Sequence, residues 1–289
     1  MLFRSINVLD GFTATFTGTV TVQEPLAPFV KVGPGELALL PTENSYLPQI
    51  AVKVEEGNMT GNMTYLENSS INIAAGASLT IHESIEPNVS HNYYGSTNRQ
   101  NIQGSGQVII DGLTDSTLYF LVPPTQTEPQ LTNSYTGGTV LQRGTIAISV
   151  DGALGDSAGD VTGNGGVLRT VLVPGRIPTN TIESTRDFVL NRDTGFNTDE
   201  STTLIIDGTV SGSGSVVKEG EGTLEIDGTI HETTPTFVGR GTMTVNGTSG
   251  SVTVEEGGLL KGVGLVKGNA TIKGVGAAGA SIGALSVAG

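Results

Sequence analysis

One short motif in this sequence could support nucleophilic catalysis. Gly155-Asp156-Ser157-Ala158-Gly159 fits the pattern G-x-S-x-G, in which a sharp turn between a strand and a helix exposes a reactive serine. No helical pattern follows the motif, and the possible bases His82, His91 and His231 are scattered and lie in no motif. We therefore interpret 155–159 as a solvent-facing turn, and we predict surface or capping positions for the three histidines.

Acidic residues could serve glycoside hydrolysis or bind a cation. Glu55-Glu56 and Glu255-Glu256 are adjacent carboxylates, but glycoside hydrolysis needs two carboxyl groups that face each other across about 5–10 Å. Because neighbours after a strand point to opposite faces, we predict that both pairs are solvated turn residues. Oxygen ligands on glycine turns suit Ca²⁺, so a weak calcium site is the alternative interpretation of Asp151, Asp156, Asp160 and Asn164. We predict no catalytic, cofactor-binding or metal residues.

Two glycine-rich segments resemble phosphate-binding loops only superficially. Gly212-Ser213-Gly214 and residues 262–268 (GVGLVKG) would need to open a helix whose N-terminus faces a phosphate. We interpret them as corners between strands. Four Asn-x-Ser/Thr sequons are interpreted as chance matches in a Thr-rich chain, and they begin at Asn58, Asn62, Asn68 and Asn246.

The composition limits the class of protein that can position such residues. The 289 residues include 14 Lys+Arg and 28 Asp+Glu, a net charge of −14, which excludes the basic face that nucleic-acid binding needs. Cysteine is absent, so the chain forms no disulfide or thiolate metal site. No apolar run approaches the ~20 residues of a membrane-spanning helix, and the start lacks a signal-peptide pattern. We expect no membrane insertion by this segment.

Alternating residues predict an all-β fold. Residues 11–22 place threonines on one face and mainly Phe, Ala and Val on the other, as in a half-buried strand. No long segment has apolar spacing of 3.6, and the 42 glycines are too frequent for helices. Further strands are predicted at 36–39, 71–73, 78–81, 145–150, 223–226, 242–245, 251–254 and 270–272.

Short internal repeats extend this prediction to a β-solenoid. Ile-Asp-Gly ends at Gly112, Gly208 and Gly228, and Val-x-Val-Glu-Glu-Gly occurs at 52–57 and 252–257. Such units cannot bury their apolar side alone and must stack. Single-glycine corners and few aromatic residues favour a parallel β-helix over a β-sandwich, with roughly 20 to 25 residues per turn. In this stack we predict that Val254 faces inward and Thr253 outward.

Three polar or proline-containing stretches are predicted to be loops that project from the stack, at 84–101, 122–130 and 174–199. Any local function is expected there.

With the repeats identified, the sequence resembles autotransporter passenger domains with autotransporter-associated β-strand repeats, also called passenger-associated transport repeats. Residues 133–155 are similar to the family pattern N-x-Y-T-G-G-T, strand, strand, G-A-L-G. Residues 208–226 and 31–39 resemble the preceding unit, and 250–264 with 281–287 resemble closing turns. Asn44-Ser-Tyr-Leu-Pro48 departs from the pattern because T-G-G does not follow.

The resemblance implies a single-stranded, right-handed, pectin-lyase-like parallel β-helix that is exported by type V secretion. Such a passenger is displayed at the bacterial cell surface or outer membrane, or is released as an extracellular protein. It also implies a host or neighbouring-cell ligand and a C-terminal translocator barrel, which this sequence lacks. We therefore expect one continuous solenoid over 1–289, with repeat-like units at about 28–46, 104–155 and 204–289, as a fragment of a longer passenger.

The sequence is compatible with three functions. We favour a structural and adhesive, non-catalytic passenger stalk. The alternatives are a polysaccharide-active β-helix enzyme, which the absence of Trp and the 14 basic residues disfavour, and a phage or spore surface spike.

Overall fold

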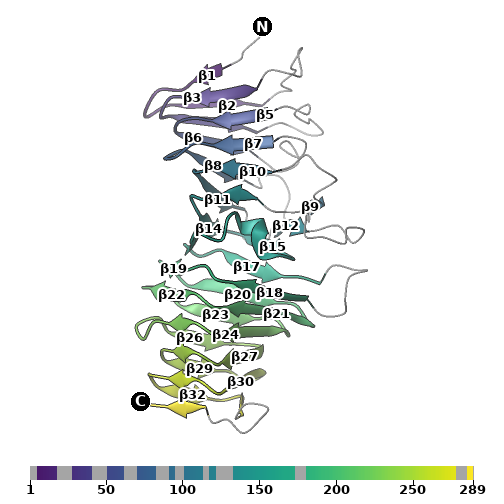
Figure 1. The fold of residues 1–289 in the computed structure, drawn as a ribbon, viewed down its shortest axis with the longest axis vertical. Helices are drawn as coiled ribbons and strands as arrows, with labels where there is room; N and C mark the ends of the chain where they lie inside the picture. The colour runs from purple at the N-terminus through teal and green to yellow at the C-terminus, as the bar shows by residue number, and fades with distance from the viewer. Residues whose placement is uncertain are drawn as a thin grey trace. The chain divides into compact units, whose positions relative to one another are not determined.

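A computed structural model defines the fold (Figure 1) and describes residues 5–17, 28–40, 51–61, 70–82, 91–94, 101–112, 117–121, 133–172, 180–277 and 285–288. The chain divides into two compact units. Unit 1 comprises Met1–Thr145 and Gly152–Gly159, and unit 2 comprises Ile146–Asp151 and Asp160–Gly289. The stretch of sequence that passes between them includes β15 (Thr145–Ile148) and a 3-10 helix, η1 (Asp151–Leu154).

Unit 1 consists of parallel strands in rows. One row runs in the order β1 (Ser5–Asn7), β3 (Phe29–Val32), β5 (Ala51–Val54), β7 (Ser70–Ile73), β10 (Ile102–Gly104) and β13 (Ser134–Tyr135). A second row runs β2 (Thr13–Phe16), β4 (Glu36–Leu39), β6 (Asn58–Gly61), β8 (Ser78–Ile81), β11 (Gln107–Asp111) and β14 (Thr139–Arg143). In addition, β9 (His91–Tyr94) pairs with β12 (Thr117–Leu121). Each coil of the chain therefore adds one strand to each of the first two rows.

Unit 2 repeats a three-strand coil. The first row is β16 (Val161–Gly163), β19 (Phe188–Leu190), β22 (Thr209–Gly212), β25 (Thr229–Ile230), β28 (Thr248–Ser249), β31 (Leu265–Val266) and β34 (Ser286–Val287). The second is β17 (Val167–Thr170), β20 (Thr194–Thr198), β23 (Val216–Glu219), β26 (Thr236–Val238), β29 (Val252–Val254) and β32 (Ala270–Ile272). The third is β18 (Asn180–Ser184), β21 (Thr202–Ile206), β24 (Thr223–Ile226), β27 (Gly241–Val245), β30 (Gly258–Gly262) and β33 (Val275–Gly276).

This arrangement is a parallel β-helix, and it confirms the predicted fold class. Successive strands of unit 2 enter the three rows in turn, and from β19 onwards each pairs in parallel with the strand one coil earlier (Figure 1). The coils are shorter than predicted near the end of the unit, because Val238 pairs with Val254 and Val254 with Ile272, steps of 16 and 18 residues. Corners that use one or two glycines leave fewer residues between strands.

The core of unit 2 lies between its three rows and is made of inward-facing side chains from alternate strand positions. Val252 and Val254 are 1 % and 0 % exposed, whereas Thr253 between them is only half-buried, so the predicted facing is confirmed. Phe188 and Phe196 pack with ring centroids 5.6 Å apart and planes tilted by 60°. This burial of apolar side chains from every coil is the main source of stability.

The structure corrects two of the loop predictions, each over part of its range. Within 174–199, residues 180–199 contain the strands β18, β19 and β20, so this stretch is a coil of the stack. Buried threonines at 194 and 198 explain the error, because they interrupt the apolar alternation of an inward face. The stretch 84–101 contains the strand β9 at 91–94. Residues 84–90, 95–100, 122–130 and 174–179 lie outside the described residues.

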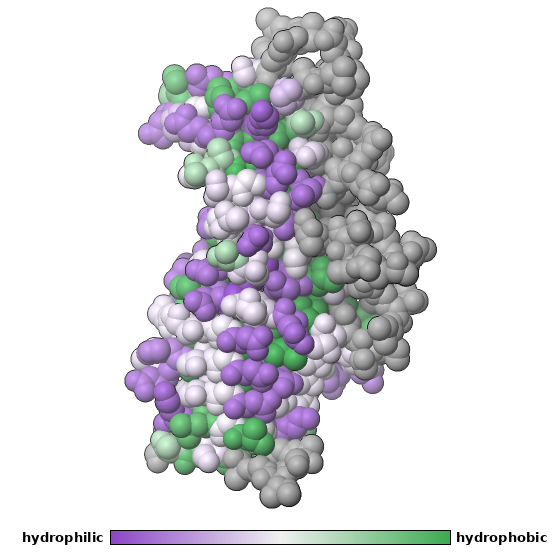
Figure 2. All heavy atoms as spheres, in the orientation of Figure 1, coloured by the Kyte–Doolittle hydropathy of each residue, from purple (hydrophilic) through white to green (hydrophobic). Residues whose placement is uncertain are grey.

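The face of unit 2 that Figure 2 shows is mainly polar. In the view of Figure 2, hydrophilic and neutral side chains cover most of the part that corresponds to unit 2, with a few hydrophobic residues among them. Large exposed apolar residues in this unit are Phe237, Val263, Ile272, Val275 and Val287. Among the helices that the structure describes, none has the length and apolar character needed to cross a membrane.

Candidate functional site

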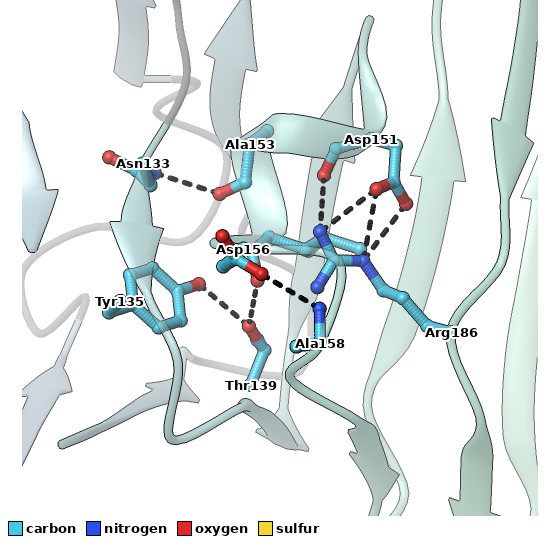
Figure 3. Close-up of polar contacts among 9 residues, drawn as sticks. Asn133, Tyr135, Thr139, Asp151, Ala153, Asp156, Ala158 and Arg186 are labelled. Atoms are coloured by element: carbon cyan, nitrogen blue, oxygen red, sulfur yellow. Dashed lines mark hydrogen bonds and ion pairs between the residues drawn. The ribbon is translucent and has the colours of Figure 1, made fainter. Parts of the chain in front are cut away.

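The G-x-S-x-G segment is an exposed turn. Asp156, Ser157 and Ala158 are exposed, and Asp156 Oδ1 accepts a hydrogen bond of 2.9 Å from the Ala158 backbone N–H (Figure 3). The 3-10 helix η1 precedes the motif and the strand β16 follows it. The segment is therefore not the strand–turn–helix that positions a nucleophilic serine, and the predicted turn is confirmed.

The histidines with described side chains have local partners. His82 Nδ1 lies 3.7 Å from Asp111 Oδ2, and the same carboxylate accepts hydrogen bonds of 2.6 and 2.9 Å from Arg143. Chiefly through its hydrogen bonds, Arg143 lowers the pKa of Asp111. His231 Nδ1 lies 2.8 Å from Thr233 Oγ1 at an exposed position. His91 belongs to β9, and its side chain lies outside the described part of the chain.

The most specific repeat motif, N-x-Y-T-G-G-T with G-A-L-G, forms a buried polar network in unit 1 (Figure 3). Asn133 Nδ2 donates to the Ala153 carbonyl at 2.8 Å, and Asn133 Oδ1 accepts from the Ile102 backbone N–H at 3.1 Å. Tyr135 is 1 % exposed, and its hydroxyl lies 2.6 Å from Thr139 Oγ1, which donates to the Leu154 carbonyl at 3.0 Å. The polar residues of the motif thus satisfy buried backbone groups.

We predict that Asn133→Ala destabilises the chain by about 2 kcal/mol, because a buried N–H and a buried carbonyl lose their partner. Ser134→Ala is the matched control, since Ser134 is the exposed neighbour on the same strand. A urea titration followed by circular dichroism measures both. Equal changes in the two variants would contradict the structural role of Asn133.

The candidate calcium ligands include one side of a buried ion pair in unit 2. Arg186 has a side chain 0 % exposed, and its Nε and Nη2 donate to the Asp151 carboxylate at 2.9–3.1 Å (Figure 3). Asn164 Oδ1 accepts a hydrogen bond of 3.0 Å from Asn191 Nδ2. Within the described ranges, no three His, Asp or Glu side chains are grouped so that they could hold a metal ion. The Asp151 carboxylate is therefore paired with the Arg186 guanidinium.

The glycine-rich segments are corners, as predicted. Gly212 and Gly262 have φ of 123° and 139°, values that favour glycine, and a Cβ at either position would overlap the backbone of the preceding coil. Neither segment opens a helix: Gly212 ends β22 and Gly262 ends β30.

The paired carboxylates are turn residues, which confirms that prediction. Glu55, Glu56 and Glu256 are exposed. Glu255 accepts hydrogen bonds of 2.9 and 3.0 Å from Lys273 Nζ.

Two sequon asparagines take part in side-chain networks between coils. Asn58 Oδ1 accepts hydrogen bonds from Ser78 and Thr80 at 2.9 and 3.0 Å. Asn246 Nδ2 donates to Glu225 and Asp227 at 2.7 and 3.0 Å. Asn62 and Asn68 lie outside the described residues.

Sequence reasoning missed an acidic groove in unit 2. Its volume is about 600 Å³, and it is lined by Leu172, Asn197, Asp199, Glu200, Glu219, Gly220, Glu221 and Arg240. Asp199 accepts hydrogen bonds of 2.8 and 3.0 Å from Arg169, and Glu221 lies 3.4 Å from Arg240. The pattern along one strand could not reveal the groove, because its residues come from four successive coils.

Fold and polar contacts together define a parallel β-helix protein whose repeat motifs satisfy buried backbone groups. No family model matches the chain, and no solved structure matches it. It is similar to the "Adhesin BmaC autotransporter" of Brucella suis biovar 1 (strain 1330), with 38 % identity over 99 residues. The match covers 34 % of this chain and 3 % of that protein, so a third of this chain corresponds to a small part of the relative.

Proposed function

We propose that this chain is part of the passenger of an autotransporter adhesin, displayed at the bacterial cell surface. The similarity over 99 residues to a protein named as an autotransporter adhesin carries the proposal. The parallel β-helix supports it, because stacked coils can fold one after another and present an extended surface for binding. The ligand class is a molecule on a host cell or a neighbouring cell.

We further propose that the role is structural and adhesive rather than catalytic, and that the full-length protein reaches the surface by type V secretion through its own translocator domain. In support, Asn133 and Thr139 donate hydrogen bonds to backbone carbonyls, and Arg186 donates to the Asp151 carboxylate. Their hydrogen-bonding capacity therefore serves the fold.

Adhesion can be tested by displaying residues 1–289 on a non-adherent bacterial strain and counting cells bound to epithelial monolayers and to cells of other bacteria. We expect several-fold more bound cells with the chain than with the display carrier alone. The variant Thr253→Asp, altered at a half-buried outward position, should retain binding if it is displayed at the same level. Binding no greater than that of the carrier on every surface would contradict the adhesive role.

The same purified chain distinguishes adhesion from polysaccharide cleavage. Incubation with acidic and neutral polysaccharides should release no new chain ends above the background of a heat-denatured sample. Release of ends in proportion to protein concentration would replace the adhesive proposal with an enzymatic one.

A further inference from the structure

A fully buried lysine connects two coils of unit 2. Lys218 lies on β23 and is 0 % exposed. Its Nζ donates hydrogen bonds to the carbonyls of Glu219 at 2.8 Å and Gly220 at 2.7 Å, and to that of Arg240 at 3.0 Å. The first two acceptors belong to the same coil, whereas Arg240 belongs to the next coil, two residues after Val238, the strand partner of Lys218.

Unit 1 contains the same arrangement. Lys31 on β3 is 0 % exposed, and its Nζ donates to the carbonyls of Val32, Gly33 and Glu56 at 2.5–3.0 Å. Glu56 again lies on the next coil, two residues after the strand partner of the lysine, Val54. The two lysines thus have equivalent acceptors in two separate units of the chain.

Three carbonyl oxygens surround each lysine Nζ and form a carbonyl cage that matches the chemistry of an ammonium group. An ammonium has three N–H donors and no acceptor, and here three carbonyl oxygens take all three hydrogen bonds. Burying a charged group costs free energy unless hydrogen bonds compensate, so the cage accounts for lysine at an otherwise apolar position. Both sites share the sequence Lys-x-Gly-x-Gly, at 31–35 and 218–222.

We propose that Lys31 and Lys218 are built-in cations, each of which clamps its own coil to the next one at a glycine corner, and that the sequence Lys-x-Gly-x-Gly marks such a clamp. The side chain acts through its charge and its three donors, and an apolar side chain of similar length does not replace it. At Lys218 the clamp also holds three residues that line the acidic groove, Glu219, Gly220 and Arg240.

The surrounding charges are consistent with an ammonium at neutral pH. Burial lowers the pKa of Lys218 to about 8, while the nearby carboxylates of Glu219 and Glu221 act in the opposite direction. Burial likewise lowers the pKa of Lys31, opposed by Glu56. With a pKa of about 8, Lys218 remains mostly protonated at pH 7 and can donate all three hydrogen bonds.

The test compares Lys218→Met and Lys31→Met with matched lysines that have exposed side chains. Lys267→Met serves as the control in unit 2 and Lys53→Met in unit 1, where Lys53 lies on the strand paired with β3. Hydrogen–deuterium exchange at pH 7 should become at least tenfold faster in peptides from 216–241 for Lys218→Met, and in peptides from 29–40 and 51–58 for Lys31→Met. The controls should leave these rates unchanged.

Chemical rescue separates the charge from simple packing. In Lys218→Ala the carbonyl cage remains while the ammonium and its chain are removed, so added n-propylammonium should restore slow exchange in 216–241. n-Propanol at the same concentration, which has the same apolar chain without the charge, should not. Unchanged exchange in Lys218→Met, or equal rescue by the alcohol and the ammonium, would overturn the proposal. If Lys218→Ala fails to fold even with n-propylammonium, the Lys31→Met comparison in unit 1 decides the same question.

Discussion

Val254→Asp is expected to lower the free energy of unfolding by about 4 kcal/mol or more, because it places an unpaired carboxylate in the core of unit 2. Val254 is 0 % exposed and lies between Val238 and Ile272 of the adjacent coils. The same substitution at Thr253, on the outward face of the same strand, should change stability by no more than about 0.5 kcal/mol.

Urea titrations of both variants and the parent chain, followed by circular dichroism, measure this difference. Protonating the introduced carboxyl at low pH should recover part of the loss, because a neutral acid is less costly to bury. Similar destabilisation by Val254→Asp and Thr253→Asp would contradict the assigned inward and outward faces, and with them the stacking of coils.

Arg186→Met is expected to destabilise unit 2 by about 3–5 kcal/mol, since it leaves a carboxylate without its cation in a largely desolvated position. The Asp151 side chain is 19 % exposed, and Arg186 donates to both of its oxygens and to its backbone carbonyl. Methionine keeps much of the volume of the arginine stem, so most of the loss reports the broken ion pair.

A double-mutant cycle isolates that pair. Asp151→Asn should also destabilise unit 2, because it leaves the fully buried Arg186 guanidinium without its counter-ion, although the amide oxygen can still accept one hydrogen bond from it. The combination Asp151→Asn with Arg186→Met should be less destabilising than the two single changes added together. Additive effects would show that the two side chains stabilise the fold independently, contrary to the observed geometry.

The fold class could be predicted from sequence because the alternation of apolar and polar residues is visible within each single strand. Residues 251–254 show the alternation of one strand, and the glycines around them mark its ends, so the buried face follows from period alone. The same rule failed at 180–199, where the buried residues Thr194 and Thr198 suggested a polar loop. A threonine is polar, but its side chain is small enough to pack in the core between coils.

The polar residues that matter most were harder to predict, because their partners lie on other coils. Lys218 reaches a carbonyl 22 positions later, and Arg186 pairs with an aspartate 35 positions earlier. The alternation within one strand predicts that charged residues face the solvent. It does not show which residues of the neighbouring coils lie beside them. The recurrence of Lys-x-Gly-x-Gly was the available sequence signal for the two clamps. Only the strand register shows that each lysine lies beside a carbonyl of the next coil.

The proposed function requires that this chain belongs to a passenger displayed at the cell surface. Antibodies raised against purified residues 1–289 test it most directly, when applied to intact cells of the producing bacterium with and without brief protease treatment. We expect labelling of intact cells that protease removes, while a cytoplasmic marker protein stays protected. Labelling that appears only after the cells are lysed, and that resists protease on intact cells, would contradict surface display.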